Sequence, residues 1–219
     1  RDALTLAVKE IFGKKSLDNT TVRTQLDISM KIIVGGLIIT AILLFVFFQF
    51  GVVHNLGWAL AGLLIVLIIS FLFTTVAANA IAIVGTNPVS GMTLMTLILS
   101  SIVLTSVGLK GESGMIAALI IGGVVCTALS MAGGFITDLK IGYWLGSTPR
   151  KQEQWKFLGV LVSALTVGFV IMILNETYGF VGEGSLVAPQ ANAMAAVIQP
   201  LMDQQPAPWI LYIVGAILA

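Results

Sequence analysis

The sequence predicts an all-α polytopic protein, a bundle of transmembrane helices that contains a broken or re-entrant segment. Of its 219 residues, 58% are hydrophobic and only 10% are charged, which is too apolar for a soluble globular domain. No Asp, Glu, Lys or Arg occurs between Lys31 and Lys110, a stretch long enough for three crossings of about 20 residues each. In the middle of this stretch, the segment GTNPVSGMT carries residues that interrupt a helix.

The apolar stretches predict about five full spans and the start of a sixth. The expected spans are residues 32–53, 58–80, 91–109, 113–135 and 157–174, and the sixth begins at Ala207. We therefore divide the chain into a polar segment, residues 1–31, and a transmembrane portion, residues 32–219. Residues 188–202 are uncharged but short, which predicts a re-entrant or interfacial helix.

Small residues recur at four-residue spacing within the expected spans. In lipid, such residues allow helix backbones to approach closely and gain dispersion contacts. We expect them to serve general packing of the bundle more than one specific dimer face. The pairs are Ala118 with Gly122, Gly159 with Ser163, and Ala164 with Gly168.

The distribution of basic residues predicts the orientation. Six Lys and Arg residues precede the first span and four follow the fourth span, whereas Lys110 falls on the opposite side. By the positive-inside rule, the N-terminal segment and the loop 138–156 are expected in the cytoplasm of a multi-pass protein of the inner (plasma) membrane. The formal net charge of +1 gives no indication of a nucleic-acid partner.

The sequence predicts neither enzyme chemistry nor a bound metal or cofactor. It shows no pattern of nucleophile, base and orienting acid and no phosphate-binding GxxxxGK[ST] loop. His54 has no Cys, Asp or Glu at ligand spacing and is interpreted as a solvated interfacial side chain. Cys126 lies in an apolar run and is interpreted as a small core residue.

The helix-breaking segment is the first candidate site. Pro88 removes a backbone donor and its ring displaces a carbonyl one turn earlier, so a continuous helix through Asn87 is not expected. It is either an ordinary cytoplasmic turn in which Ser90 caps the next helix, or a recessed break whose freed backbone groups line a substrate cavity. The second interpretation makes substrate-binding candidates of Asn79, Thr86, Asn87, Ser90 and Gly91.

The loop that begins with DLKIGYWLGSTPRKQ, residues 138–152, also carries polar groups. Its charges and aromatic residues are typical of a topology-setting loop with an interfacial belt. Alternatively, Asp138 joins a substrate or proton path and Tyr143 contacts the substrate. The candidates for proton coupling are Asp138, Glu176 in the expected external loop, and residues outside this chain.

The segment APQANAMA, residues 188–195, presents two neutral amides. Gln190 and Asn192 can each donate and accept hydrogen bonds, which suits a peptide backbone without imposing a charge. An external interfacial helix whose amides face water is the alternative.

The three quoted motifs, in this order and spacing, resemble the oligopeptide transporter (OPT) family, most of all its prokaryotic members related to the yellow-stripe-like metal-chelate transporters. The resemblance covers residues 32–219, and one departure is AGGFIT, residues 132–137, where relatives often have a more polar lead. Family members are much longer and are built as repeated halves, so the resemblance implies a piece from the later half of such a protein. It also implies a secondary transporter that imports small peptides or metal chelates, generally with protons.

These observations lead to two hypotheses about function. The first is proton-coupled symport of oligopeptides or peptide-like metal chelates by alternating access. Its partners would be the substrate, protons, the lipid bilayer, the remaining spans of the transporter and, as a further candidate, a second copy of the chain. The second is a channel or a non-transporting scaffold subunit; a channel would show charge rings or a carbonyl-rich filter, and a scaffold would tolerate Asn87→Ala and Pro88→Ala.

Overall fold

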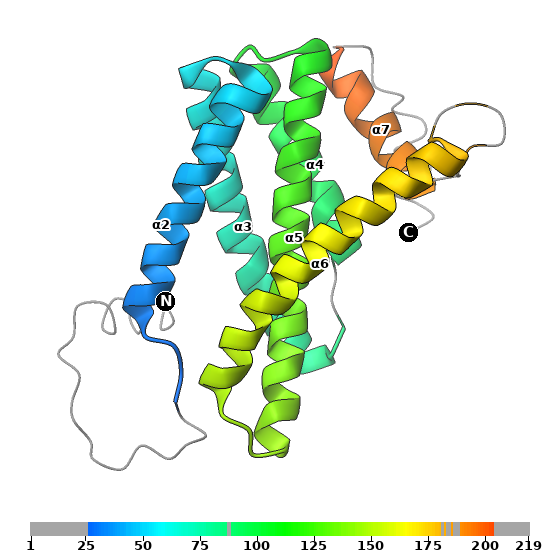
Figure 1. The fold of residues 1–219 in the computed structure, drawn as a ribbon. Helices are drawn as coiled ribbons and strands as arrows, with labels where there is room; N and C mark the ends of the chain where they lie inside the picture. Colours follow the sequence, from blue (N-terminus) through cyan, green and yellow to red (C-terminus); the bar gives the residue numbers. More distant parts are fainter. Residues whose placement is uncertain (1–25, 87–88, 181, 183–184, 186–188, 204–219) are drawn as a thin grey trace. The chain divides into compact units, whose positions relative to one another are not determined.

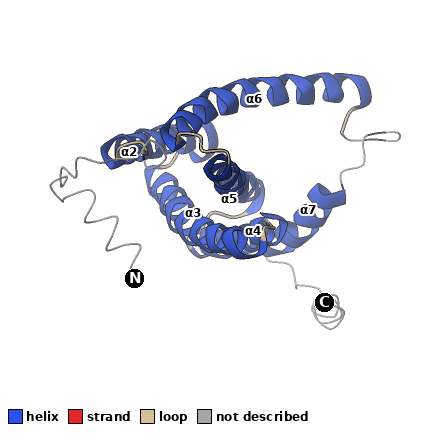
Figure 2. Cartoon of the chain, turned by 90° about the horizontal axis from the view of Figure 1, so that it is seen from below, coloured by secondary structure: helices blue, strands red, loops and turns tan. Residues whose placement is uncertain are grey.

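The computed structural model describes residues 26–86, 89–180, 182, 185 and 189–203, with backbone alone at Ser90, Pro189 and Gln190. Every regular element in these residues is a helix (Figure 2), which confirms the predicted all-α fold. In chain order they are α2 (Met30–Phe47), the π-helical η2 (Phe48–Val53), α3 (Leu56–Val84), α4 (Val89–Ser106), α5 (Gly111–Trp144), α6 (Pro149–Tyr178) and α7 (Pro189–Met202) (Figure 1).

Four segments of the described chain are long and apolar enough to cross a membrane. They are Met30–Val53, Leu56–Val84, Gly111–Trp144 and Pro149–Tyr178, which correspond to the first, second, fourth and fifth predicted spans. The third predicted span is α4, whose 18 residues extend about 27 Å, close to the ~30 Å thickness of the hydrocarbon core. The predicted sixth span lies outside the described residues, so the number of spans stays a prediction.

The chain divides into two compact units. Unit 1 comprises residues 1–43 and 134–187, and unit 2 comprises residues 44–133 and 188–219. Unit 1 therefore contains the first part of α2, the end of α5 and all of α6. Unit 2 contains η2, α3, α4, the first part of α5 and α7.

Small residues of α5 bring the helices of unit 2 together. A Cβ atom on Gly122 would overlap the side chain of Leu97 from α4, at 2.9 Å from its Cγ. A Cβ atom on Gly114 would lie 3.0 Å from Sδ of Met202 on α7. Ala118, midway between the two glycines, is fully buried. The predicted packing role of Ala118 and Gly122 is therefore confirmed, because α4 and α7 approach α5 along this row.

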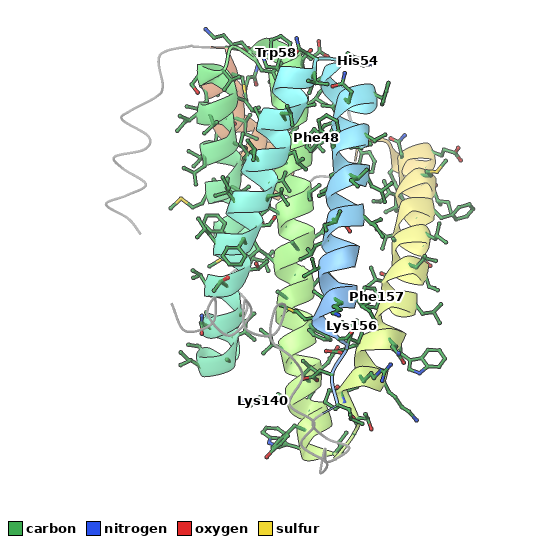
Figure 3. The ribbon with its side chains drawn as sticks, turned by 90° about the vertical axis from the view of Figure 1, so that its left-hand side faces the viewer. Phe48, His54, Trp58, Lys140, Lys156 and Phe157 are labelled. Atoms are coloured by element: carbon green, nitrogen blue, oxygen red, sulfur yellow. The ribbon has the colours of Figure 1, made fainter. Side chains whose placement is uncertain are left out.

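The π-helical turn η2 completes one side of the core of unit 2. Phe48, its first residue, is buried, and its ring lies 3.6 Å from the place where a Cβ atom on Gly62 of α3 would stand. At the end of this turn, His54 adopts the left-handed conformation with φ 53° and its side chain is exposed. Figure 3 shows Phe48, His54 and Trp58 near the η2–α3 turn.

In unit 1, the chain that precedes α2 caps the start of α6. The backbone N–H of Arg150 donates to the carbonyl of Leu26 at 2.9 Å, and the N–H of Ile28 donates to Oε2 of Glu153 at 2.9 Å. The first N–H groups of a helix have no partner within it, and the N-cap residue Thr148 makes no side-chain cap bond. The carbonyl of Leu26 therefore takes part of the role that a capping side chain would have.

α5 and α6 form an antiparallel hairpin in unit 1. Lys156 of α6 makes an ion pair with Asp138 of α5, and its Nζ lies 5.7 Å from the ring centroid of Phe135. One turn further toward the connecting loop, a Cβ atom on Gly142 would overlap the side chain of Gln152. Away from the hairpin end, every residue from 157 to 173 is exposed, including the small-residue pairs predicted on this helix.

The glycine row of α5 yields a test. Gly122→Ala should lower the free energy of unfolding by about 1–3 kcal/mol, because the added methyl group overpacks against Leu97. Gly123→Ala is the matched control, since a Cβ atom there meets nothing within 4 Å. The measurement is equilibrium unfolding of the full-length protein in detergent. Equal stability of the two variants would contradict the packing described.

Candidate functional site

The predicted helix break lies between α3 and α4. α3 ends at Val84, and Gly85 adopts the left-handed conformation with φ 79° while its N–H donates to the carbonyl of Ile81 at 2.9 Å. A glycine adopts this conformation without steric cost, so it ends the helix cleanly. α4 begins at Val89. The interruption is therefore present, although Asn87 and Pro88 themselves lie outside the described residues.

Both sides of the break are open in the described chain. Thr86 is exposed, and a Cβ atom on Gly91 would meet nothing within 4 Å. Ser90 lies in the first turn of α4, but only its backbone is described. These residues leave room for a solute or for further helices.

Asn79, a substrate-binding candidate, makes a local hydrogen bond. Its Nδ2 donates to the carbonyl of Thr75 on the same helix at 3.0 Å. The side chain is exposed. A side-chain amide can use one N–H donor in such a local hydrogen bond, and its Oδ1 acceptor is still available to bind a ligand.

α7 is a half-length helix. Its 14 residues extend about 21 Å, which is too short to cross ~30 Å of hydrocarbon, as the sequence predicted. α7 packs against α4, and the C-terminal ends of the two helices meet where the hydroxyl of Thr105 lies 3.6 Å from Sδ of Met202. The two helices therefore run in the same direction (Figure 1).

The polar groups at the starts of α4 and α7 lie on the same side of this contact. Measured along each helix axis, Asn192 is about 15 Å from Met202 and Gly91 is about 21 Å from Thr105. Asn192 is exposed, and the side chain of Gln190 is outside the described set. Within unit 2, the starts of both helices thus lie on the N-terminal side of the contact between Thr105 and Met202.

The other candidates belong to unit 1, where two carboxylates lie at opposite ends of α6. Asp138 contacts Lys156 near the start of α6, and Glu176 is exposed in its last turn. Lys156 and Glu176 are 20 positions apart, which corresponds to about 30 Å of helix, the thickness of a hydrocarbon core. The two predicted carriers therefore do not share a site. Tyr143 is 75% exposed near the end of α5.

Sequence reasoning missed a row of buried hydroxyl groups on α4. Thr93, Thr96, Ser100 and Ser101 are all buried. The first three donate to carbonyls of their own helix, at 2.7, 2.8 and 3.1 Å, whereas Oγ of Ser101 has no hydrogen-bond partner among the described residues. The spacing of Thr93, Thr96 and Ser100, at intervals of three and four residues, was the available signal.

The fold and these sites define a polytopic α-helical membrane protein with an interrupted helix and a half-length helix. The model of the family described as "OPT oligopeptide transporter protein" matches residues 5–219. The chain belongs to this family.

Two curated proteins are similar to the chain. One, from Haemophilus influenzae, is named "Putative oligopeptide transporter" and is 27% identical over 210 residues, which cover 84% of this chain and 33% of that protein. The other, from Saccharomyces cerevisiae, carries the same description and is 23% identical over 124 residues, which cover 57% of this chain and 17% of that protein. The chain thus spans a third or less of the relatives that it matches. No solved structure shows a significant match.

The capping contact in unit 1 yields a second test. Glu153→Ala should make the backbone amide of Ile28 exchange with solvent about tenfold faster, because a hydrogen bond to a charged group contributes about 1.5 kcal/mol. Gln154→Ala, at the next and exposed position, is the control. Hydrogen exchange of the reconstituted full-length protein measures both. An unchanged exchange rate at Ile28 in the Glu153 variant would show that the contact is not maintained.

Proposed function

We propose that this chain is part of a proton-coupled symporter that imports oligopeptides or peptide-like metal chelates by alternating access. The observation that carries the proposal is the pairing, within unit 2, of an interrupted helix with a half-length helix that runs parallel to α4. Interrupted helices in membranes are tolerated where protein or a wet cavity surrounds them, and transporters bind solutes at such places. Membership of the OPT family supports the same class of function.

The chemistry of these two helix starts suits a peptide. The N-terminal end of α7 carries a partial positive charge from its aligned peptide dipoles, which attracts the terminal carboxylate of a peptide or a chelator. Asn192 and Gln190 offer neutral donors and acceptors for the amide groups. Around the break, Thr86, Asn87 and Ser90 would bind further polar atoms, with the backbone of Gly91 accessible beside them.

Substitution of Asn192, an exposed amide of α7, tests substrate binding. Asn192→Ala should raise the substrate concentration for half-maximal uptake by about five- to tenfold, as expected for the loss of one hydrogen bond. Gln199→Ala is the matched control, because Gln199 is an exposed amide near the opposite end of the same helix. Uptake of a peptide and chelate panel into proteoliposomes under a pH gradient is the measurement.

The same assay decides between transport and the alternatives. Asn87→Ala and Pro88→Ala should each lower uptake strongly, whereas a scaffold would tolerate both changes. If a pH gradient drives no accumulation of any compound in the panel by the unmodified full-length protein, the proposal of proton-coupled symport is wrong.

For proton coupling, we favour Asp138 over Glu176. Asp138 is joined to Lys156 in an ion pair that links α5 and α6, so its protonation would remove the charge that holds this link. A link that depends on protonation is the kind of contact through which a proton can bias two arrangements of a bundle. Glu176 has no ion-pair partner among the described residues.

Neutral isosteres test this assignment. Asp138→Asn should abolish the dependence of uptake on the pH gradient while leaving exchange of substrate between the two sides intact. Glu112→Gln, which neutralises an exposed carboxylate in the first turn of α5, is the control. If Asp138→Asn and Glu176→Gln both retain proton-driven uptake, the proton carrier lies in the rest of the full-length protein.

The contacts before α2 support the predicted topology. Residues 26–28 bond to the start of α6, which supports placing the end of the N-terminal segment and the loop between α5 and α6 on the same side of the membrane. This arrangement agrees with an even number of crossings between them. We propose the cytoplasm of a plasma-membrane protein as that side, since the basic residues gather there.

A further inference from the structure

Three basic and three aromatic side chains gather at the end of the α5–α6 hairpin in unit 1. The three aromatic side chains are 71–75% exposed, and the three basic side chains are exposed as well. We name this set the hairpin-end cluster; its members are Lys140, Tyr143 and Trp144 of α5 and Arg150, Lys151 and Trp155 of α6. Figure 3 shows Lys140 at this end of α5, with Lys156 and Phe157 further along α6.

The register of the hairpin places the cluster within a thin layer. Asp138 is level with Lys156, and Gly142 is level with Gln152. Because the helices are antiparallel, moving one residue back along α5 corresponds to moving one residue forward along α6. Trp144 is therefore level with Arg150, and Tyr143 with Lys151; Lys140 and Trp155 fall within one residue of each other. Together the six side chains occupy about 8 Å of the hairpin axis.

The adjacent part of α6 fixes the level of the bilayer. Residues 157–174 contain no charged side chain and extend about 27 Å, close to the thickness of the hydrocarbon core. The hairpin-end cluster begins directly beyond this stretch. Each interfacial layer of a bilayer is about 5–8 Å thick, so the cluster occupies the layer of the lipid headgroups.

The charge of this layer is positive. The carboxylate of Asp138 is paired with Lys156 and that of Glu153 accepts the N–H of Ile28. In the described part of the chain, the three bases of the cluster have no carboxylate within 4.0 Å, and the first turn of α6 contains no acidic residue. Glu153 keeps its negative charge when it accepts the hydrogen bond from Ile28, and Asp27, next to Leu26, is an exposed acid. These two carboxylates do not balance the three cations of the cluster.

We propose that the hairpin-end cluster binds the headgroups of anionic phospholipids. Lys140, Arg150 and Lys151 would attract the phosphate and the net negative charge, while Trp144 and Trp155 lie at the interface as aromatic anchors. The acyl chains of these lipids would lie along the exposed apolar length of α6, residues 157–173. A soluble anion has no such chains, so the apolar surface favours a lipid as the ligand. This proposal is independent of the transported substrate.

The test compares lipids on the full-length protein. Brominated phosphatidylglycerol and brominated phosphatidylcholine compete for the protein in mixed micelles, and quenching of tryptophan fluorescence reports the relative affinity. The unmodified protein should prefer phosphatidylglycerol by at least about tenfold, since each basic residue near an anionic surface contributes about fivefold. The triple variant Lys140→Gln, Arg150→Gln, Lys151→Gln should reduce this preference to near unity.

Two controls test whether the preference for phosphatidylglycerol comes from the hairpin-end cluster. Lys110 is an exposed base of unit 2, and the variant Lys110→Gln should keep the full preference for phosphatidylglycerol. In the unmodified protein, 0.5 M NaCl should weaken this preference because salt screens the charges. The proposal is overturned if the triple variant retains its preference, if Lys110→Gln loses as much, or if inorganic phosphate displaces phosphatidylglycerol. If the triple variant does not fold, the three single variants replace it, and preferences equal to that of the unmodified protein would equally overturn the proposal.

Discussion

In hydrocarbon, every backbone amide and carbonyl must find its partner within the protein, and this constraint determines most of the structure. It explains why the described elements are all helices and why long apolar stretches continue without interruption. The same constraint applies to the interruption between α3 and α4, because the backbone groups freed there need hydrogen-bond partners from protein, water or a solute. The N–H of Gly85 still makes the ordinary helical hydrogen bond to Ile81, and the groups freed beyond it are the place where we propose that a ligand binds.

Packing differs sharply between the two units. In unit 2, glycine and alanine on α5 admit Leu97 and Met202 so closely that a methyl group would not fit at Gly122. In unit 1, α6 has small residues at the same spacing, but residues 157–173 are exposed throughout. The two units therefore differ in how their small residues are used, and those of α6 admit no neighbouring helix among the described residues.

The sequence predicted the helices well because hydrophobicity and length decide what crosses a bilayer. It placed their ends less well: α5 continues to Trp144 and α6 begins at Pro149, beyond the predicted spans, since charged residues end a hydrophobic stretch without ending a helix. Pro149 is suited to the first turn of a helix. The π-helical turn at Phe48 was not predicted, because no simple residue pattern marks it.

The candidate site was predicted only in part. The break between α3 and α4 and the short helix α7 followed from proline chemistry and length. The local hydrogen bond of Asn79 and the burial of Thr96 and Ser101 did not, because the spacing of hydroxyl residues marks a shared helix face but does not show whether that face is covered. The contact between Leu26 and Arg150 had no signal at all, since it uses backbone atoms that every residue carries.

That contact also has a consequence for biosynthesis. The partners Ile28 and Glu153 are separated by 125 positions, so the chain before α2 emerges from the ribosome long before α6 exists. During insertion of α2 through α5, the carbonyl of Leu26 has no helix to cap. This contact therefore closes only after α6 has been synthesised, 125 positions later than its first partner.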